Sequence, residues 1–148
     1  MANDNREKII GYTAGVYDMF HIGHLNIIKK AKEACDYLIV GVNSDEATYN
    51  YKKKYPIIPH KERMEIVEAI KYVDEVVSVE NTDKIYAFEK YDYDIIFVGN
   101  DHENEPVWQE IDNHLRKHGA KVFYIPYTEH ISSSKLSEVI SRLPFSFE

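Results

Sequence analysis

Short apolar runs that alternate with helical patterns are the feature that most constrains the fold of this chain. The runs are bounded by turn-forming residues and cover residues 8–13, 37–42, 75–79, 94–99 and 121–127. Continuous apolar runs of this length are typical of strands buried on both faces. Because strands that alternate with helices form parallel sheets, we predict an α/β fold, an open parallel five-stranded sheet with helices on both faces.

The segments between these runs carry apolar residues at helical spacing. The clearest stripe contains Ile22, Leu25, Ile28, Ala31 and Cys35, which share one face of a helix. Further helical patterns cover residues 62–72, 83–91, 107–118 and 134–143. Residues 43–59 break the alternation with a polar, lysine-bearing stretch that ends in prolines. We predict a long functional loop there, rather than a linker between domains.

Length and composition favour one domain spanning residues 1–148. A chain of 148 residues buries roughly 68–70% of its unfolded surface without disulfides or structural metal. The formal net charge of −7 argues against binding to nucleic acid or to an anionic membrane surface. The single cysteine, Cys35, excludes an internal disulfide and is expected to be a buried thiol. With no apolar leader and no run of about 18 apolar residues, we expect a cytoplasmic protein.

Two histidines three residues apart, His21 and His24, follow the first apolar run. Gly15 lies at the end of that run, so we predict a tight turn that opens a helix at the histidines. A helix N-terminus favours anions, and Gly23 leaves its backbone open to a phosphate. Zinc-binding H-E-x-x-H helices have a spacing of four and an internal acid. The pattern therefore favours a phosphate site over a metal site; exposed histidines at a helix start are the alternative.

Three consecutive lysines at positions 52–54 lie in the predicted loop. On a mobile loop at a phosphate-binding edge, they can close over a triphosphate and neutralise developing charge. Arg63, at the start of the next helical pattern, is a candidate to join them. The alternatives are a solvated surface for the lysines and a surface ion pair with Glu62 or Glu65 for the arginine.

Polar residues also follow the last two apolar runs. Asp101 comes just after Gly99, where a carboxylate can contact ribose hydroxyls or a metal, or simply form a turn. Ser132, Ser133 and Ser134 precede the last helical pattern, and hydroxyls at a helix start supply an N-cap and phosphate donors. Ligands of doubly wound sheets bind outside the carboxyl ends of the strands. We therefore expect these groups to meet the histidines at one edge.

Together these motifs resemble the cytidylyltransferase family of the nucleotidyltransferase superfamily, over nearly the whole chain. Residues 15–24, Gly-Val-Tyr-Asp-Met-Phe-His-Ile-Gly-His, are similar to the family's G-x-F-D-x-x-H-x-G-H motif. Residues 71–76 are similar to its R-Y-V-D-E-V motif, and residues 127–134 to its R-T-x-G-I-S-T-T signature. The resemblance is closest to the bacterial glycerol-3-phosphate cytidylyltransferases. It implies the Rossmann-like fold of the HxGH nucleotidyltransferases.

The resemblance implies a role for each matching residue. His21 and His24 would bind the triphosphate and stabilise the transition state, and Lys52 would bridge the donor and acceptor phosphates. These three are the expected catalytic residues. Lys52 and Lys84 are the expected acceptor-binding residues. The expected nucleotide-binding residues are Gly15, Val16, Tyr17, Asp18, Gly23, Lys54, Arg63, Asp101, Tyr127, Thr128, Ile131, Ser132, Ser133 and Ser134.

Three positions depart from the family's pattern. Tyr127 stands in place of the signature arginine, so one phosphate or base contact is lost or supplied elsewhere. His130 replaces a glycine and adopts a positive φ at greater cost. His102 follows Asp101 where the glycerol-phosphate enzymes carry a tryptophan. These changes bear on the acceptor and the donor base, and they leave the paired histidines intact.

The implied reaction is attack by an acceptor phosphate oxygen on the α-phosphorus of CTP, with release of pyrophosphate and formation of a CDP-linked product. A phosphate ester has its second pKa near ~6 and needs no protein base. Mg²⁺ is expected to bind through the triphosphate, with no metal site made by the protein alone. The expected acceptor is similar to glycerol 3-phosphate. The alternatives are phosphocholine, phosphoethanolamine or a sugar phosphate, or ATP as donor.

Two other functions use similar features. Class I aminoacyl-tRNA synthetases also carry the paired histidines, but this acidic chain of 148 residues has no room for a tRNA-binding domain. A nucleotide-sensing module without turnover is the non-enzyme alternative. The resemblance also implies a homodimer. Tyr86, Phe88, Tyr91 and Tyr93 either form an apolar patch for the dimer interface or pack in the core.

Overall fold

The computed structural model of the chain describes residues 8–126, 128 and 131–142. The sheet contains β1 (Ile10–Gly15), β2 (Tyr37–Asn43), β3 (Glu75–Val79), β4 (Ile95–Gly99) and β5 (Lys121–Ile125). The helices are α1 (Ile22–Glu33), α2 (Asp45–Lys52), α3 (His60–Glu68), α4 (Lys84–Tyr91), α5 (Pro106–Arg116) and α6 (Ser133–Ser141), with one 3-10 turn, η1 (Asn100–His102). No described helix has the length and apolar character needed to cross a membrane.

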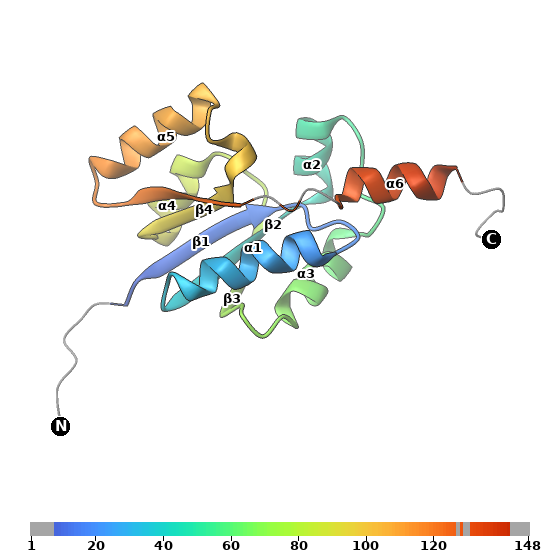
Figure 1. The fold of residues 1–148 in the computed structure, drawn as a ribbon, viewed down its shortest axis with the longest axis horizontal. Coiled ribbons are helices and arrows are strands. Elements are labelled where there is room, and N and C mark those ends of the chain that lie inside the picture. Colours follow the sequence, from blue (N-terminus) through green and yellow to red (C-terminus); the bar gives the residue numbers. More distant parts are fainter. Residues whose placement is uncertain (1–7, 127, 129–130, 143–148) are drawn as a thin grey trace.

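The five strands lie in the order β3-β2-β1-β4-β5, and every neighbouring pair is parallel (Figure 1). The predicted open parallel sheet is therefore confirmed. The chain winds from β1 to β2 and β3 on one side, and then crosses to β4 on the other side of β1. Such a reversal opens a crevice beyond the carboxyl ends of the two strands that flank it. The turns that follow β1 and β4 meet at this place.

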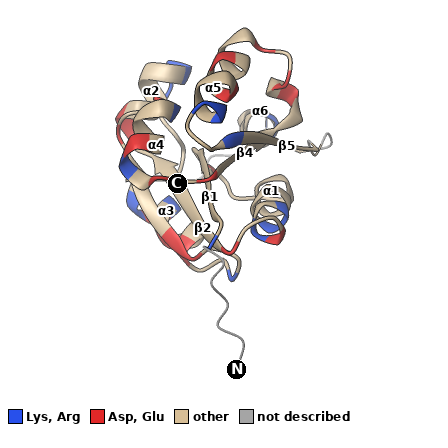
Figure 2. Cartoon of the chain, turned by 90° about the vertical axis from the view of Figure 1, so that its left-hand side faces the viewer, with Lys and Arg blue, Asp and Glu red and all other residues tan. Residues whose placement is uncertain are grey.

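Both faces of the sheet are covered at its centre, which explains why β2 and β4 are continuously apolar. Leu38 and Val40 of β2 belong to a core shared with Ile28 of α1 and Val67 of α3. Ile39, between them, faces the opposite core, which contains residues of α4 and α5. In Figure 1, α1 and α3 lie below the sheet and α4 and α5 above it. Acidic and basic residues are interspersed on the outer surfaces of the helices (Figure 2).

The prediction of a continuous loop over residues 43–59 is wrong, because α2 occupies its first half. The hydroxyl of Ser44 caps this helix by accepting a hydrogen bond from the backbone N–H of Ala47 at 3.0 Å, and acidic residues fill its first turn. Only Ala47 and Thr48 of the helix are buried. Its sequence, Asp-Glu-Ala-Thr-Tyr-Asn-Tyr-Lys, contains no Leu, Ile, Val, Met or Phe, so it lacks the apolar stripe by which periodicity detects helices.

The other predicted elements are present within a few residues of their expected bounds. The first strand begins at Ile10 instead of residue 8, and α3 spans His60–Glu68 instead of residues 62–72. The expected ends of the last strand and the last helix, Tyr127 and Leu143, lie outside the described residues. Most of the elements that position the cavity described below were thus predicted from the apolar pattern.

The aromatic residues of α4 and the segment after it serve mainly in the core. Tyr93 is buried and stacks on Tyr12 with ring centroids 5.2 Å apart, and Phe88 contacts the Tyr93 ring edge-on. Tyr86 is exposed. Cys35 is partly buried, and its thiol donates to the Ala31 carbonyl at 3.2 Å. Core packing therefore accounts for most of this cluster, and the homodimer stays a prediction.

Candidate active site

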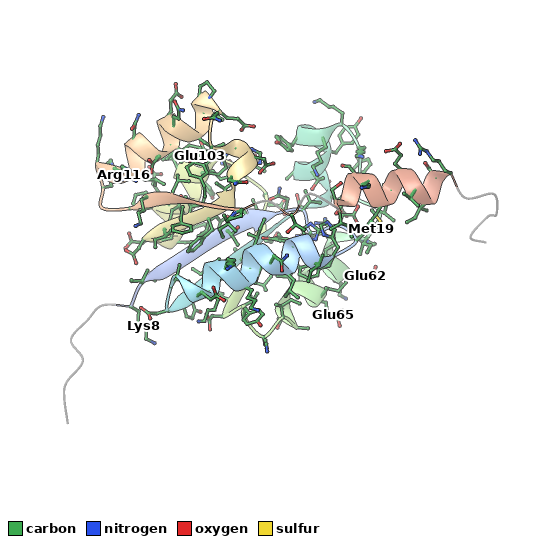
Figure 3. All side chains as sticks on the ribbon, in the orientation of Figure 1. Lys8, Met19, Glu62, Glu65, Glu103 and Arg116 are labelled. Atoms are coloured by element: carbon green, nitrogen blue, oxygen red, sulfur yellow. The ribbon has the colours of Figure 1, made fainter. Side chains whose placement is uncertain are left out.

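A cavity of about 720 Å³ opens at the carboxyl edge of the sheet. Its walls come from the turn between β1 and α1, the ends of β2 and α2, the segment after β3, the η1 turn after β4, and the start of α6. Figure 3 shows this edge, with Met19 labelled in the turn before α1. The structure thus brings together the groups that were expected to meet there.

The turn between β1 and α1 is held in an uncommon backbone conformation. Tyr17 and Met19 have positive φ angles of 56° and 48°, which cost side-chain-bearing residues about 1–3 kcal/mol each. The carboxylate of Asp18 accepts hydrogen bonds from the backbone N–H groups of Ile57 and Ile58 at 2.8 and 2.9 Å. These bonds fix the turn against the segment that follows the lysines. The strain is therefore supported by contacts from a distant part of the chain.

His21 and His24 form a reciprocal cap at the start of α1. Nδ1 of His21 accepts from the backbone N–H of Gly23 at 3.0 Å, and Nδ1 of His24 accepts from the backbone N–H of His21 at 3.3 Å. The two rings stack with centroids 3.9 Å apart, and both residues line the cavity. A ring whose Nδ1 accepts a hydrogen bond carries its proton on Nε2 when neutral. The cap therefore specifies two neutral N–H donors.

The electrostatic surroundings keep His24 neutral. Burial, the adjacent His21 and the nearby Lys52 lower the pKa of His24 from its ordinary value of 6.5 to about 3. Protonation would also remove the lone pair with which Nδ1 caps the helix. Because a neutral imidazole still donates through Nε2–H, His24 can hydrogen-bond a phosphate oxygen without becoming an imidazolium ion.

Gly23 is required by the histidine pair itself. A Cβ atom at this position would lie 2.8 Å from Cε1 and 3.0 Å from Nδ1 of the His21 ring. Any side chain there would displace the ring from its capping position. The sequence analysis assigned this glycine to the approach of a phosphate, and the structure adds the packing of His21 as a second reason.

The three lysines at the end of α2 separate into different environments. Lys52 lines the main cavity. Desolvation and the neighbouring Lys54 lower the pKa of Lys52, and Asp18 offsets part of this effect. Lys53 ends the helix in a left-handed conformation, with φ 62°. Lys54 lines a smaller adjoining pocket that also contains Ser134. Of the three, only Lys52 is placed among the lining residues of the main cavity.

Arg63 lies behind the wall of the cavity. It is fully buried; its Nε donates to the Ile58 carbonyl at 2.8 Å, and its Nη1 donates to the carbonyls of Val16 and Asn43 at 2.6 and 2.8 Å. Its Nη2 pairs with the Asp45 carboxylate at 2.7 Å. The guanidinium therefore ties the ends of β1 and β2 to the loop after the lysines. The structure assigns it a positioning role instead of the expected nucleotide contact.

The suggested ion pair of this arginine with its helical neighbours is wrong. Glu62 and Glu65 are exposed on the outer side of α3, as their labels in Figure 3 show, whereas the guanidinium is turned inward. Burial of the arginine is made possible by backbone carbonyls and one carboxylate, which satisfy its donors.

The start of α6 is attached to the histidine turn. Ser132 caps the helix by accepting from the backbone N–H of Lys135 at 3.0 Å, and Ser133 donates to the Asp18 carbonyl. Asn26 of α1 donates to the Thr128 hydroxyl at 3.2 Å. The lining residues of this segment are Thr128, Ile131, Ser132, Ser133 and Ser134. Tyr127 and His130, the two departures in this signature, lie outside the described residues.

Asp101 and Lys84 lie on the cavity wall, whereas the segment 71–76 lies elsewhere. Asp101 lines the cavity, with Oδ1 2.5 Å from the place of a Cβ at Gly99, and Lys84 lines it from the start of α4. Burial lowers the pKa of Lys84. The segment 71–76 is not among the lining residues. Its Asp74 instead accepts from the backbone N–H of Leu38 at 2.7 Å, which joins the starts of β3 and β2.

The cavity has two further walls that sequence reasoning did not include. An apolar wall contains Val98 of β4 and Val107, Trp108 and Ile111 of α5. A polar wall near the ends of β2 and β3 contains Asn43, Lys52, Thr82 and Lys84, of which the two lysines were expected. Asn43 and Thr82 were detectable in principle, because each follows or ends an apolar run at the edge where ligands bind.

Comparisons with known proteins agree with this geometry. The model of the family described as cytidylyltransferase-like matches residues 12–139. The FAD synthase of Thermococcus kodakarensis is 36% identical over 147 residues, which cover 97% of each chain. The glycerol-3-phosphate cytidylyltransferase of Bacillus subtilis is 34% identical over 139 residues, or 93% of this chain and 99% of that protein. The lipopolysaccharide core biosynthesis protein from Thermoplasma volcanium superposes with a TM-score of 0.69 at 26% identity, covering 84% of this chain and all of that one.

Proposed function

This chain belongs to the cytidylyltransferase-like family of nucleotidyltransferases, and we propose that it transfers CMP from CTP to a small phosphorylated acceptor similar to glycerol 3-phosphate. The observation that carries the proposal is the histidine cap of α1, which presents His21 and His24 to a cavity that Lys52 and the first residues of α6 also line. Helix starts, lysine and hydroxyl groups are suited to bind a triphosphate.

The proposed substrates occupy the cavity in three parts. The triphosphate lies against the histidine cap and the serines of α6, where N–H and O–H donors are concentrated. The nucleoside lies along the apolar wall, with Asp101 near the ribose hydroxyls. The acceptor lies at the polar wall, so that Lys52 and Lys84 bind its phosphate. This division places the acceptor phosphate and the α-phosphorus close to Lys52.

The chemical step is a displacement at phosphorus. An acceptor phosphate oxygen forms a bond to the α-phosphorus of CTP, the bond from that phosphorus to the bridging oxygen breaks, and pyrophosphate leaves with the electron pair. The protein aligns the reacting atoms and stabilises the added charge on the α-phosphate, as in other phosphoryl transfers. Neutral His24 donates through Nε2–H, and Lys52 supplies positive charge.

We propose that Mg²⁺ enters with the triphosphate and neutralises part of its charge. In the part of the chain that the structure describes, no three His, Cys, Asp or Glu side chains gather at a metal-binding distance. The phosphate oxygens would supply the principal ligands of the ion.

A panel of two nucleotides and several acceptors tests the proposal. CTP or ATP is incubated with Mg²⁺ and glycerol 3-phosphate, phosphocholine, phosphoethanolamine, a sugar phosphate or FMN. Pyrophosphate release measures turnover, and mass spectrometry identifies the product. The proposal predicts CDP-glycerol, or a CDP-linked product of a similar acceptor. Turnover only with ATP would refute CTP as the donor.

Transfer of AMP from ATP to FMN, which gives FAD, is the second candidate. Its support is the 36% identity to an archaeal protein named FAD synthase over 97% of the chain, together with Trp108 in the apolar wall, since indole stacks well on flat aromatic rings. FAD formation in the same panel would select this reaction.

A further inference from the structure

Asn43, the last residue of β2, is one of the residues of the polar wall. Its backbone carbonyl accepts from Arg63 at 2.8 Å, and its strand neighbour in β3 is Val79. Lys52 lies on the helix that begins just after it, and Thr82 lies three residues beyond Val79. Asn43 is therefore placed between the two segments that supply the rest of this wall.

The side-chain amide of Asn43 is incompletely satisfied. The residue is 8% exposed, it lines the cavity, and its Oδ1 is buried with no hydrogen-bond partner among the described residues. A buried carbonyl oxygen is almost always paired, because leaving it unpaired forfeits the hydrogen bonds that water gave it. A donor group brought by a ligand would restore the missing bond.

We infer that Asn43 selects the acceptor by hydrogen-bonding a hydroxyl group carried beside the acceptor phosphate, so that the acceptor is a phosphate ester of a polyhydroxy alcohol. This inference rests on the proposed function. Oδ1 only accepts, so the ligand must bring an O–H or N–H donor. Lys52 and Lys84 on the same wall are suited to the phosphate, and the Thr82 hydroxyl to a second oxygen of the alcohol.

The inference separates phosphocholine from the hydroxylated acceptors of the panel. The quaternary ammonium group of phosphocholine has no N–H and cannot satisfy Oδ1. Glycerol 3-phosphate carries hydroxyls next to its phosphoester, and FMN carries them on its ribityl chain. The polyhydroxy class therefore includes the preferred acceptors of both candidate reactions and excludes phosphocholine.

The first test uses the wild-type protein with two acceptors that differ only in hydroxyl groups, glycerol 3-phosphate and propyl phosphate. A site built to pair a substrate hydroxyl discriminates strongly against the analogue that lacks it. We expect kcat/KM to be at least ~10-fold higher for glycerol 3-phosphate. If FMN is the acceptor, the matched analogue is a flavin with an unsubstituted pentyl phosphate chain. Equal use of the two members of the pair would overturn the inference.

The second test replaces the amide by an apolar group of similar size, Asn43→Leu. We expect kcat/KM for the hydroxylated acceptor to fall at least ~10-fold, while that for the hydroxyl-free analogue stays close to wild type. Loss of structure at the end of β2 would instead lower both values together, and that result would contradict the inference. Asn50→Leu, at an exposed position of α2 outside the cavity, is the matched control and should keep the wild-type preference.

Binding measurements separate failure of the inference from failure of the proposed function. Calorimetric titration of the CTP-loaded protein with either acceptor needs no turnover. Tighter binding of glycerol 3-phosphate than of propyl phosphate, lost in Asn43→Leu, supports the inference even if no pyrophosphate is released. Turnover or binding without any preference for the hydroxylated acceptor would contradict the role of Asn43 and would leave the proposed nucleotidyl transfer unaffected.

Discussion

The turn between β1 and α1 and the segment between β2 and α3 both bring polar groups to the cavity, but they are held very differently. The first is fixed by the reciprocal histidine cap and by the two hydrogen bonds to Asp18. The second carries Tyr51 and Tyr55 at 69% and 61% exposure, and its hydrogen bonds to Arg63 and Asp18 lie on either side of the lysines. The hydrogen-bond donors for the reacting phosphate are therefore rigid, whereas the lysines lie on an exposed segment.

Arg63 and Lys52, which we expected to act together on the triphosphate, therefore have different roles. Arg63 uses its donors on protein acceptors and so positions both segments. Lys52 lies on the cavity wall, where a substrate phosphate can meet its ammonium group. Buried arginine fits the first role because its planar group satisfies several acceptors at once, and a flexible lysine fits the second.

The largest effect is expected on catalysis when the rigid turn loses a donor. His21→Ala and His24→Ala should each lower kcat at least ~100-fold, the scale of losing one transition-state hydrogen-bond donor. Pyrophosphate release measures kcat, and circular dichroism checks the fold. A variant with near-wild-type kcat would show that its histidine does not act on the reacting phosphate.

Replacing the buried arginine should affect stability first. Arg63→Met leaves three backbone carbonyls and the Asp45 carboxylate without their donor, so we expect the free energy of unfolding to fall by about 3 kcal/mol. Urea titration measures it. The control is Arg116→Met, which removes an ion pair with Asp112 on the surface of α5 and should cost less than ~1 kcal/mol. Equal losses of unfolding free energy in the two variants would contradict the positioning role of Arg63.

In the exposed segment that carries the lysines, substitution should lower activity and leave stability nearly unchanged. Lys52→Met is expected to lower kcat/KM at least ~30-fold through loss of charge at the reacting phosphates, while the free energy of unfolding changes by less than ~0.5 kcal/mol. Lys53→Met, one residue further along and outside the cavity lining, should stay near wild type in both measurements. Matching activity losses in the two variants would indicate a general effect of charge instead of a specific contact.

The last effect appears only below about pH 6.5 and is a pH dependence of stability carried by His24. Its pKa is lowered from 6.5 to about 3 in the folded protein, so below pH 6.5 the unfolded chain takes up a proton that the folded chain refuses. This contribution to stability is complete above about pH 6.5 and decreases as the pH falls toward 3. Urea titrations across this range should give a shallower slope for His24→Gln than for wild type. Identical slopes would mean that His24 takes up a proton as readily in the folded protein as in the unfolded chain, which would contradict the lowered pKa.

The strands were predictable because each carries a short apolar run, which is longest in the buried central strands. Helix α2 was missed because its eight residues include no aliphatic side chain larger than alanine, so no stripe forms. The signal present was local: Ser44 followed by two acidic residues is typical of a helix start. Periodicity therefore finds helices that carry an aliphatic stripe and misses a short polar helix that only its cap marks.

The site was predictable where the motif itself determines the local structure. The spacing of His21, Gly23 and His24 is sufficient to form the cap, because every partner lies within the same turn. The burial of Arg63 was not predictable, since its four acceptors come from distant segments and arginine is rarely fully buried. Asn43 was missed for a similar reason: its unpaired oxygen is visible only when the ends of β2 and β3 are placed side by side.

The central claim is that neutral histidines at the start of α1 donate hydrogen bonds to the triphosphate. Nitrogen NMR of the protein labelled with ¹⁵N-histidine, recorded at pH 7 before and after addition of CTP and Mg²⁺, tests it most directly. We expect a His24 ring that is protonated on Nε2 alone in both samples, with the Nε2 signal shifted by the nucleotide. An imidazolium signal for His24, or a ring resonance that does not respond to nucleotide, would contradict it.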